Sequence, residues 1–458
     1  MRLLVECTYV YEHPQDNSGI QRVVRNIIRQ LARVQAGVEC VPVMMNGGRL
    51  YQVLSLEPLP VDRAKNRRQK LVMRLDHARN RYWWLHSRLE RLPPFRSSKL
   101  ARRLLYWPCK LLSLGITLPL RGLLWLNRNA QPAPQRAVEL QAEAGDYLLL
   151  LDSSWHADFF DLAERLKGQG VGIVSVIYDL IPLTHPQFCD SGLVKVFDQW
   201  FDWVSRTADG FMAISQTVSR QVDTELQARL GSAEAARRWH GYFHLGSELD
   251  LKRPSAELHK SVRRMFEQPA PVYLMVSTVE PRKNHAYLLD AFERLWAEGS
   301  DARLCIIGKI GWKCEALVER IKSHPQQGKR LFMFNNVDDK SLEFAYSKAR
   351  ALVFPSHAEG FGLPLVEAMQ RGLPVMASDI PVFREVGQDF MAYFDLQDPG
   401  SLVELIKAFE RSGQFPAARS IEHWQWVDWA AAAEQLVSRT LHGIQGTSRK
   451  AVVDADCP

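Results

Sequence analysis

The chain has 458 residues, of which 46% are hydrophobic and 24% charged, and its formal net charge is +7. This composition excludes a disordered or fibrous protein, and the length predicts two ordinary α/β cores rather than one. The cysteines, at positions 7, 40, 109, 189, 305, 314 and 457, include no C-x-x-C pair, so we expect reduced thiols and no zinc site. The N-terminal MRLLVECTYVYE places a glutamate where a signal peptide needs an apolar region. It therefore predicts a first strand in an intracellular protein.

A glycine precedes the first amphipathic helix, in QDNSGIQRVVRNIIRQLARV. Ser18 and Gly19 stand directly before a helix that we expect to begin near Ile20. The N–H groups at a helix N-terminus bind anions, so Gly19 would bring backbone close to a phosphate. The alternative is an ordinary turn.

Residues 61–130 carry 17 lysines and arginines against three acidic residues, a net charge of +14 in a chain of +7. Aromatic residues are interleaved with these charges, at Tyr82, Trp83, Trp84, Trp107 and Trp125. Only ten uncharged residues, 111–120, stand between basic residues, which is too few to span a bilayer. The pattern predicts a segment that lies on an anionic membrane. A nucleic-acid-binding surface or a solvated helical insertion remains as an alternative.

Strand-like runs alternate with helix-length amphipathic stretches over the rest of the chain, which predicts parallel sheets covered on both faces. The strand in VIYDLIPLTHPQF ends near Asp179, with His185 following in the next loop. Ligand groups gather at the carboxyl ends of such strands, so both residues are candidates for holding a ligand. Taken alone, His185 is more typical of a hydrogen-bonded structural histidine than of a catalytic one.

Arg282 and Lys283, in EPRKN, follow a strand and stand before a helix. Preorganised cations at such a position stabilise negative charge that develops on a leaving group. The alternative interpretation is a pair of solvated charges at a helix start.

Two glutamates stand eight positions apart in HAEGFGLPLVEAM, across a stretch with two glycines and a proline. The sequence predicts a strand, a glycine loop and a helix with Pro364 in its first turn and Gly372 at its C-terminal end. The helix N-terminus favours a phosphate, and carboxylates accept hydrogen bonds from sugar hydroxyls. This chemistry suggests a nucleotide sugar, with Glu367 on a ribose diol and Glu359 on the transferred sugar. The alternative is a corner whose glutamates only cap or solubilise it.

The last stretch resembles the E-x7-E signature of retaining glycosyltransferases of family 4. Further segments are similar to that family in the same order along the chain: VSTVEPRKNHAYLLDAF, LCIIGKIGW and ASDIPVFREVG. The resemblance is weak over residues 1–55, moderate over 145–250 and strong over 270–430.

The resemblance implies an α/β fold of two Rossmann-like domains that face each other across a cleft (GT-B), with the basic helical insertion in the N-terminal domain. We expect an N-terminal domain at 1–250, a nucleotide-sugar domain at 251–425, a helix at 426–445 that returns to the first domain, and a tail at 446–458. The polar GSELDLKRPS, residues 246–255, is the expected boundary.

The resemblance also implies the site residues. The expected catalytic residues are Glu359, Lys283, Arg282 and Asp179. The expected donor-binding residues are Gly19, Thr278, Gly308, Gly360, Phe361, Gly362, Leu363 and Glu367. Tyr178 and His185 are expected on the acceptor side, although several relatives have histidine where Tyr178 stands, which leaves simple packing of Tyr178 as the alternative. No metal and no cofactor are expected, because the one good Asp-x-Asp, Asp454 to Asp456, follows no strand.

The implied function is retaining transfer of mannose or rhamnose from a GDP-sugar to a lipid-linked polysaccharide or lipopolysaccharide acceptor. The enzyme would be peripheral on the inner face of the cell membrane, with no nucleic-acid partner. A UDP-sugar-dependent enzyme of the same fold is the first alternative. A non-catalytic relative that binds sugar or nucleic acid is the second.

Overall fold

The structure, a computed structural model, describes residues 1–14, 16, 19–35, 37–57, 63–89, 93, 99–129, 136–156, 159–247, 258–335 and 337–455. Ser18, the expected domain boundary at residue 250 and the Asp456 of the Asp-x-Asp lie outside these residues. The chain divides into two compact units. The main unit comprises Met1–Val53 and Glu139–Pro458, and the insertion unit comprises Leu54–Val138.

The first sheet of the main unit has the strand order β4-β3-β2-β1-β5-β6-β7-β8. Its strands are β1 (Arg2–Glu6), β2 (Glu39–Asn46), β3 (Arg49–Val53), β4 (Ala137–Glu139), β5 (Tyr147–Leu150), β6 (Gly172–Ile177), β7 (Gly210–Ala213) and β8 (Trp239–Tyr242). Strand β3 runs antiparallel to β2, after a turn in which Gly47 and Gly48 both have positive φ. Strands β2, β1, β5, β6, β7 and β8 pair in parallel.

Helices and short turns connect the strands of this sheet. They are α1 (Thr8–Glu12), α2 (Gly19–Gln30), η1 (Leu31–Arg33), η2 (Ser154–His156), α6 (Phe160–Gly168), α7 (Ile181–Thr184), η3 (Pro186–Phe188), α8 (Ser191–Thr207), α9 (Gln216–Leu230) and α10 (Ser232–Ala235). Trp200, Phe201 and Phe211 are among the largest fully buried side chains of the core beneath them. Helix α2 begins at Gly19, one residue before the expected start.

The second sheet has the order β11-β10-β9-β12-β13-β14, with all pairs parallel. Its strands are β9 (Val272–Val276), β10 (Arg303–Ile307), β11 (Leu331–Phe334), β12 (Ala351–Phe354), β13 (Val375–Ser378) and β14 (Ala392–Phe394). Every residue of β10, β12 and β13 is buried, which is why these strands are continuous apolar runs. The expected pair of Rossmann-like domains is therefore confirmed.

The helices and 3₁₀ turns of the second domain are α11 (Lys260–Phe266), η4 (Pro281–Lys283), α12 (His285–Ala297), α13 (Glu315–Ser323), α14 (Asp339–Lys348), α15 (Leu363–Gln370), α16 (Pro381–Gly387), η5 (Gln388–Phe390), α17 (Pro399–Ser412) and η6 (Ile421–His423). The last helix of the described residues is α18 (Trp429–Ala455). Helix α15 has Pro364 in its first turn, and Gly372 at φ +70° follows its end, as the sequence predicted.

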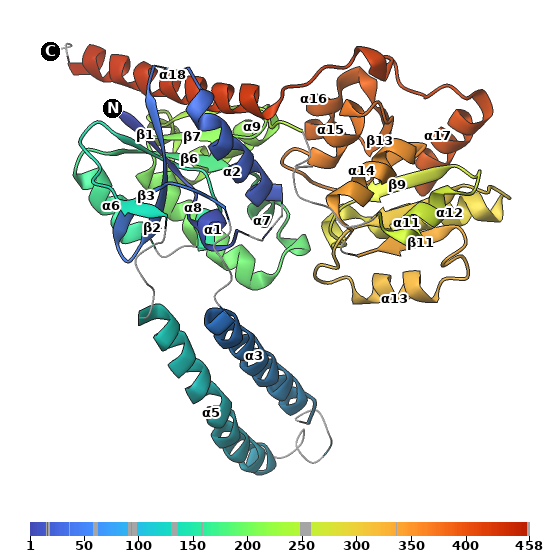
Figure 1. The fold of residues 1–458 in the computed structure, drawn as a ribbon, viewed down its shortest axis with the longest axis horizontal. Coiled ribbons are helices and arrows are strands. Elements are labelled where there is room, and N and C mark those ends of the chain that lie inside the picture. Colours follow the sequence, from blue (N-terminus) through green and yellow to red (C-terminus); the bar gives the residue numbers. More distant parts are fainter. Residues whose placement is uncertain are drawn as a thin grey trace. The chain divides into compact units, whose positions relative to one another are not determined.

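Helix α18 packs along β8 and α2 of the first domain (Figure 1). The Arg439 guanidinium donates to the Tyr242 carbonyl at 2.5 Å, and the Gln435 side chain accepts from the His244 N–H at 3.3 Å. Trp429 is buried at the start of the helix, against Gly246. The helix continues to Ala455, ten residues beyond the expected end, because no proline interrupts it before that point.

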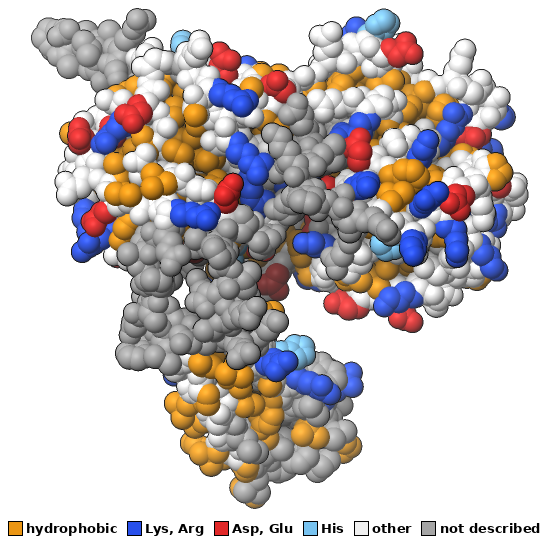
Figure 2. All heavy atoms as spheres, in the orientation of Figure 1, with side chains coloured by type: hydrophobic (Ala, Val, Ile, Leu, Met, Phe, Trp, Pro, Cys, Tyr) orange, Lys and Arg blue, Asp and Glu red, His pale blue; other side chains and the backbone are white. Residues whose placement is uncertain are grey.

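The insertion unit contains helices α3 (Arg63–Leu89) and α5 (Lys99–Asn129), which lie side by side. The Tyr82 hydroxyl donates to the Cys109 carbonyl at 2.9 Å and joins them. Large apolar side chains of α5 are exposed, and Figure 2 shows hydrophobic side chains gathered over part of this unit. The α5 apolar stripe consists of Leu100, Trp107, Leu111, Leu114 and Leu118. Their spacing of seven, four, three and four residues places them on one helical face.

Candidate active site

The candidate site lies where the strand order of the second sheet reverses. Counted along the chain, its strands stand in the order 3-2-1-4-5-6, and the reversal falls between β9 and β12. Loops 277–284 and 355–362 leave these two strands at their carboxyl ends. Open α/β sheets bind their ligands at this point. The two sequence motifs with the basic pair and with the two glutamates therefore meet at the switch point.

Lys283, Arg282 and Glu359 form the charge cluster of these two loops. The Lys283 Nζ lies 2.5 Å from Oε1 of Glu359, and the Arg282 Nη1 lies 2.7 Å from Oε2. Glu280, which the sequence reasoning missed, lies 2.7 Å from the Arg282 Nη2. The His357 N–H donates to the Arg282 carbonyl at 2.9 Å and joins the loop backbones. All four charged side chains are less than a fifth exposed.

The charges in this cluster stabilise one another against burial. Burial alone would raise the pKa of Glu359, but Arg282 and Lys283 lower it to about 2. Burial, followed by the Arg282 charge, lowers the pKa of Lys283, and Glu359 opposes that change. Burial also raises the pKa of Glu280. Glu359 is therefore an ionised acceptor that fixes two cations at the switch point.

Asp179 lies beside the charge cluster, at the carboxyl end of β6. Burial raises its pKa, and the nearby Arg282 opposes the increase. The Asp179 Oδ1 accepts from the Ile181 N–H at 3.0 Å. The neighbouring Tyr178 is buried, and its hydroxyl donates to the Leu151 carbonyl at 2.8 Å. The Tyr178 side chain thus packs in the core, the alternative that the sequence left open.

Two expected donor-binding glycines permit close approach of backbone segments. A Cβ on Gly360 would lie 2.0 Å from the Tyr178 carbonyl oxygen, and the Ser215 hydroxyl donates to the Gly360 carbonyl at 2.8 Å. A Cβ on Gly308 would lie 1.7 Å from the Ser277 carbonyl oxygen, beside Thr278. Both positions require glycine for packing within the protein, whatever they bind.

Gly19 differs from these glycines, because a Cβ there would meet nothing within 4 Å. The open space lies at the first residue of α2. Packing inside the protein therefore does not explain this glycine.

Glu367 is buried on α15 and both of its carboxylate oxygens have partners. The Arg22 Nη2 lies 2.5 Å from Oε1, and the Tyr346 hydroxyl donates to Oε2 at 2.9 Å. Arg22 stands in the first turn of α2, after Gly19, and the sequence reasoning missed both partners. Arg22 could have been noticed for its basic charge beside Gly19. Tyr346 gave no signal, because it is one aromatic residue of an ordinary amphipathic helix.

The glycine loop enters α15 through Gly362, whose φ of +102° is in the left-handed region that favours glycine. Phe361 is buried there, with its ring 6.2 Å from His244 and 5.8 Å from Trp426. Leu363 is the first residue of the helix, so the free N–H groups of α15 lie next to this loop.

Glu385, on α16, is a further residue that the sequence reasoning missed. Its carboxylate accepts from the Gln216 N–H, the Thr217 N–H and the Thr217 hydroxyl at 2.7–2.8 Å, and lies 2.9 Å from the His244 Nε2. Although burial alone would raise the pKa of Glu385, these hydrogen bonds lower it. The carboxylate thus caps helix α9 of the first domain. The sequence signal for Glu385 was its position in ASDIPVFREVG, one of the segments that are similar to the family.

His185 lies near the loop after β12. Its Nδ1 is 2.9 Å from the Thr184 hydroxyl, and its ring stacks 6.1 Å from Phe188. The Phe188 ring in turn stacks 5.1 Å from His357. Burial and the neighbouring His185 lower the pKa of His357.

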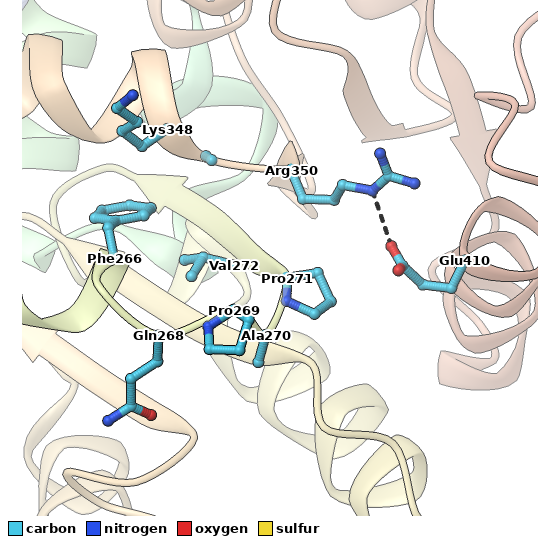
Figure 3. Close-up of a pocket in the computed structure, with 10 residues that line it drawn as sticks. Phe266, Gln268, Pro269, Ala270, Pro271, Val272, Lys348, Arg350 and Glu410 are labelled. Carbon is cyan, nitrogen blue, oxygen red and sulfur yellow. Dashed lines mark hydrogen bonds and ion pairs between the residues drawn. The ribbon is translucent and has the colours of Figure 1, made fainter.

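A hollow of about 400 Å³ lies elsewhere, at the amino ends of β9 and β12 (Figure 3). Phe266, Pro271 and Lys348 contribute to its lining, and Arg350 lies 3.1 Å from Glu410 at one side. It is separate from the candidate site, because the loops of that site lie at the carboxyl ends of the same strands. Among the described residues, no group of three or more histidine, cysteine or acidic side chains could hold a metal ion.

Residues 261–422 match the family model described as glycosyl transferases group 1. The chain is 34% identical over 297 residues to the serotype-specific mannosyltransferase WbdA of Escherichia coli, covering 64% of this chain and 36% of that protein. It is 29% identical over 267 residues to the phosphatidyl-myo-inositol mannosyltransferase of Mycobacterium tuberculosis (strain ATCC 25618 / H37Rv). That match covers 54% of this chain and 68% of that protein. The structure of sucrose-phosphate synthase (tll1590) from Thermosynechococcus elongatus matches all of both chains with a TM-score of 0.51 at 15% identity. The match to WbdA spans about a third of the length of WbdA.

Proposed function

We propose that this chain, which carries a glycosyltransferase group 1 domain, transfers a sugar with retention of configuration and without a metal ion. The donor is a GDP-sugar, with mannose or rhamnose as the sugar. The acceptor is a lipid-linked polysaccharide or lipopolysaccharide at the inner face of the cell membrane. The observation that carries the proposal is the contact of Lys283 and Arg282 with Glu359 at the switch point of this domain.

The cations of the charge cluster would stabilise the leaving group. Cleavage of the bond between the sugar and the diphosphate places negative charge on a phosphate oxygen. Lys283 and Arg282 are already fixed where loop 277–284 approaches the start of α15, so they need little reorganisation to meet that charge. Backbone N–H groups would bind the diphosphate along Gly360, Phe361, Gly362 and Leu363, with Gly19, Thr278 and Gly308 completing the donor site.

The two glutamates would bind different parts of the donor. Ionised Glu359 accepts hydrogen bonds from hydroxyls of the transferred sugar, and Asp179 holds the same sugar from the β6 side. Glu367 accepts hydrogen bonds from the ribose diol. Its carboxylate is paired with Arg22 and Tyr346, so the ribose would compete with these groups for the carboxylate oxygens.

Retention would follow from reaction on one face of the sugar. The acceptor hydroxyl approaches from the side of the departing diphosphate, and a phosphate oxygen takes the hydroxyl proton as the new glycosidic bond forms. Glu359 is already held by two cations, which favours a role in binding rather than as a nucleophile. His185 would lie on the acceptor side of this reaction.

The names of the relatives support the choice of sugar. Both curated relatives above are described as mannosyltransferases, and WbdA is serotype-specific. Residues 261–422, which match the family model, include the two loops of the charge cluster. A mannosyl donor and a polysaccharide acceptor are therefore the first to be tested.

The insertion unit would dock on anionic lipid. In the α5 apolar stripe, Leu100 is 71% exposed, Leu111 65%, Leu118 61% and Trp107 55%. Basic residues accompany the stripe on the same helix, which combines apolar insertion with attraction to anionic headgroups. No helix among the described residues is long and apolar enough to cross a membrane. The unit would thus lie on the surface and bring the site to a lipid-linked acceptor.

A thermal-shift panel of GDP, UDP, ADP and their sugars tests the proposal, because ligand binding raises the apparent stability. We expect GDP and GDP-mannose to raise the Tm most. Transfer from GDP-mannose to octyl α-D-mannobioside, followed by NMR of the product, should then show the anomeric configuration of the donor. A larger shift with UDP would indicate the UDP-sugar alternative. Binding of nucleotide or saccharide without turnover of any sugar would indicate a non-catalytic relative.

A further inference from the structure

Three loops of the main unit each bring one aromatic side chain to the same place. Phe188 comes from η3, His357 from the loop after β12 and Trp312 from the loop after β10. The Phe188 and His357 rings stack 5.1 Å apart at 14°. The Trp312 Nε1 donates to the Phe188 carbonyl at 2.9 Å. We call these three residues the aromatic platform.

The backbone around the platform is held in place on both sides. Lys313 donates from Nζ to the Cys189 carbonyl at 2.6 Å. Its φ of +51° is in the left-handed region, where a non-glycine residue is strained. Such strain persists only when the surrounding structure enforces it, and it gathers at functional sites. The Gly311 N–H donates to the Val279 carbonyl at 3.0 Å and fixes the same loop to loop 277–284.

The platform lies next to the charge cluster. His357 stands two residues before Glu359, and its N–H donates to the Arg282 carbonyl. A ligand on the platform would therefore lie close to the groups proposed to hold the transferred sugar. This position fits the molecule that receives the sugar.

The chemistry of the platform fits a pyranose ring. Trp312 is 40% exposed although its N–H is already used by Phe188, so it presents an apolar ring to solution. Burial and the neighbouring His185 lower the pKa of His357, which favours the neutral imidazole with one donor and one acceptor nitrogen. A pyranose has an apolar C–H face for the rings and hydroxyls at its edge for imidazole nitrogens. Such mixtures of aromatic surface and a few polar groups are typical of small-molecule sites.

We propose that Phe188, His357 and Trp312 form a saccharide subsite that binds the acceptor sugar. The inference rests on the proposed function and deepens it, because it names the residues that would recognise the acceptor. The subsite binds the ring whose hydroxyl is glycosylated, with the apolar face of that ring on the aromatic side chains.

Substitutions of the platform test the inference on the full chain. We would measure initial rates with GDP-mannose and octyl α-D-mannobioside, varying each in turn. Phe188→Ala and Trp312→Ala should each raise the KM for the mannobioside about tenfold, equivalent to about 1.4 kcal/mol. The KM for GDP-mannose and the Tm increase caused by GDP should stay within about twofold of those of the unchanged protein.

Conservative variants separate the rings from their structural hydrogen bond. Trp312→Phe keeps an aromatic ring but loses the N–H that binds Phe188, and Phe188→Tyr keeps the stack. Both should retain most of the affinity for the mannobioside. Phe415→Ala is the matched control, because Phe415 is a half-buried aromatic residue that packs on Phe409 of α17, away from the platform. It should leave the KM for the mannobioside unchanged.

An unchanged KM for the mannobioside in both alanine variants overturns the subsite. A rise only in the KM for GDP-mannose also overturns it, because the platform would then bind the donor. If no nucleotide binds and no sugar is transferred, the proposed function fails, and saturation-transfer NMR with octyl α-D-mannobioside decides the subsite separately. Binding that is lost in Phe188→Ala and Trp312→Ala supports the subsite. Equal binding in these variants, or none to the unchanged chain, overturns it.

Discussion

The Lys283 Nζ lies 2.5 Å from the Glu359 Oε1, although 76 positions separate the two residues in the chain. Each residue follows a different strand, and the strands β9 and β12 are neighbours in the sheet. The contact therefore depends on sheet order. Under the proposed function, it would place an ammonium group where a leaving diphosphate gains charge.

Lys283→Ala should lower kcat by about 10²–10³, because removal of one preorganised group aimed at developing charge costs roughly 3–4 kcal/mol in comparable sites. Steady-state rates with GDP-mannose measure the effect. Lys309→Ala is the control, since Lys309 is exposed in the neighbouring loop and should leave kcat unchanged.

The same assay tests whether sugar transfer proceeds without a metal ion. EDTA should leave the activity of the unchanged protein intact. Loss of activity in EDTA with recovery on addition of manganese would contradict metal-independent transfer.

Glu359→Gln and Glu367→Gln should have different effects. The first should lower kcat while the affinity for GDP changes little, as expected for a group that touches only the sugar. Glu367→Gln should weaken the binding of GDP itself, because it removes a charged acceptor for the ribose hydroxyls. Calorimetric titration with GDP measures both affinities.

Tyr346→Phe is the control for Glu367, since it removes one hydrogen bond and leaves the carboxylate charge. Its affinity for GDP should stay close to that of the unchanged protein. Loss of GDP affinity in Glu359→Gln together with normal affinity in Glu367→Gln would show that the two roles are reversed.

Gly19→Ala should leave the Tm unchanged, because its Cβ would meet no protein atom within 4 Å. It should nevertheless weaken the binding of GDP-mannose if the backbone at Gly19 approaches the donor phosphates. Gly360→Ala should instead lower the Tm by several degrees, since its Cβ would collide with the Tyr178 carbonyl oxygen at 2.0 Å. Thermal unfolding with and without GDP-mannose distinguishes these outcomes. Unaltered donor affinity in Gly19→Ala would remove this residue from the donor site.

Replacement of Trp107, Leu111 and Leu118 together by serine should reduce binding to vesicles that contain anionic lipid by more than about tenfold. These side chains are more than half exposed, and burial of one such side chain is worth up to about 1.5–3 kcal/mol. Flotation of the protein with vesicles measures binding. Binding of the unchanged protein should also fall as salt rises.

Val196→Ser is the control for this surface, because Val196 is 43% exposed on α8 of the main unit. It should float with vesicles as the unchanged protein does. An unchanged protein that ignores anionic vesicles at low salt would contradict membrane docking, and the insertion unit would then be a surface for another partner.

The stability of the first domain should fall as the pH rises from about 5 to 8. Burial, followed by the Asp152 charge, raises the pKa of Glu6 from its ordinary value to about 7. A folded pKa above the unfolded one means that the folded chain holds the proton more tightly, so stability is greatest below the unfolded pKa and is lost as the pH passes 7. Glu6→Gln should flatten this dependence in a series of thermal unfolding curves. A Tm that rises over this range in the unchanged protein would contradict the assignment.

The strand and glycine-loop corners could be predicted from sequence because their causes are local. The four residues of β12, ALVF, are all apolar, and all of them are buried. Gly362 and Pro364 then specify the loop and the first helical turn. The basic pair after β9 was found in the same way. Once both segments are placed at the carboxyl ends of neighbouring strands, their meeting follows.

The contacts of Glu367 could not be predicted in this way. Arg22 lies 345 positions away, and no local pattern links the two residues. Glu385 likewise caps a helix that begins 169 positions before it. The expected position of Tyr178 on the acceptor side also depended on where its side chain points. That side chain packs into the core, where its hydroxyl donates to the Leu151 carbonyl. Only the packing of distant elements fixes such partners.

The insertion unit closes at its base, where the Leu54 N–H donates to the Arg136 carbonyl at 2.9 Å. Its entry and exit are therefore neighbours, and a short turn would suffice to join them if everything between were deleted. Such a segment can be acquired or discarded in one genetic event without reordering the strands of the sheet. Descendants of one ancestral gene could thus differ in this segment while they inherit the same catalytic chemistry.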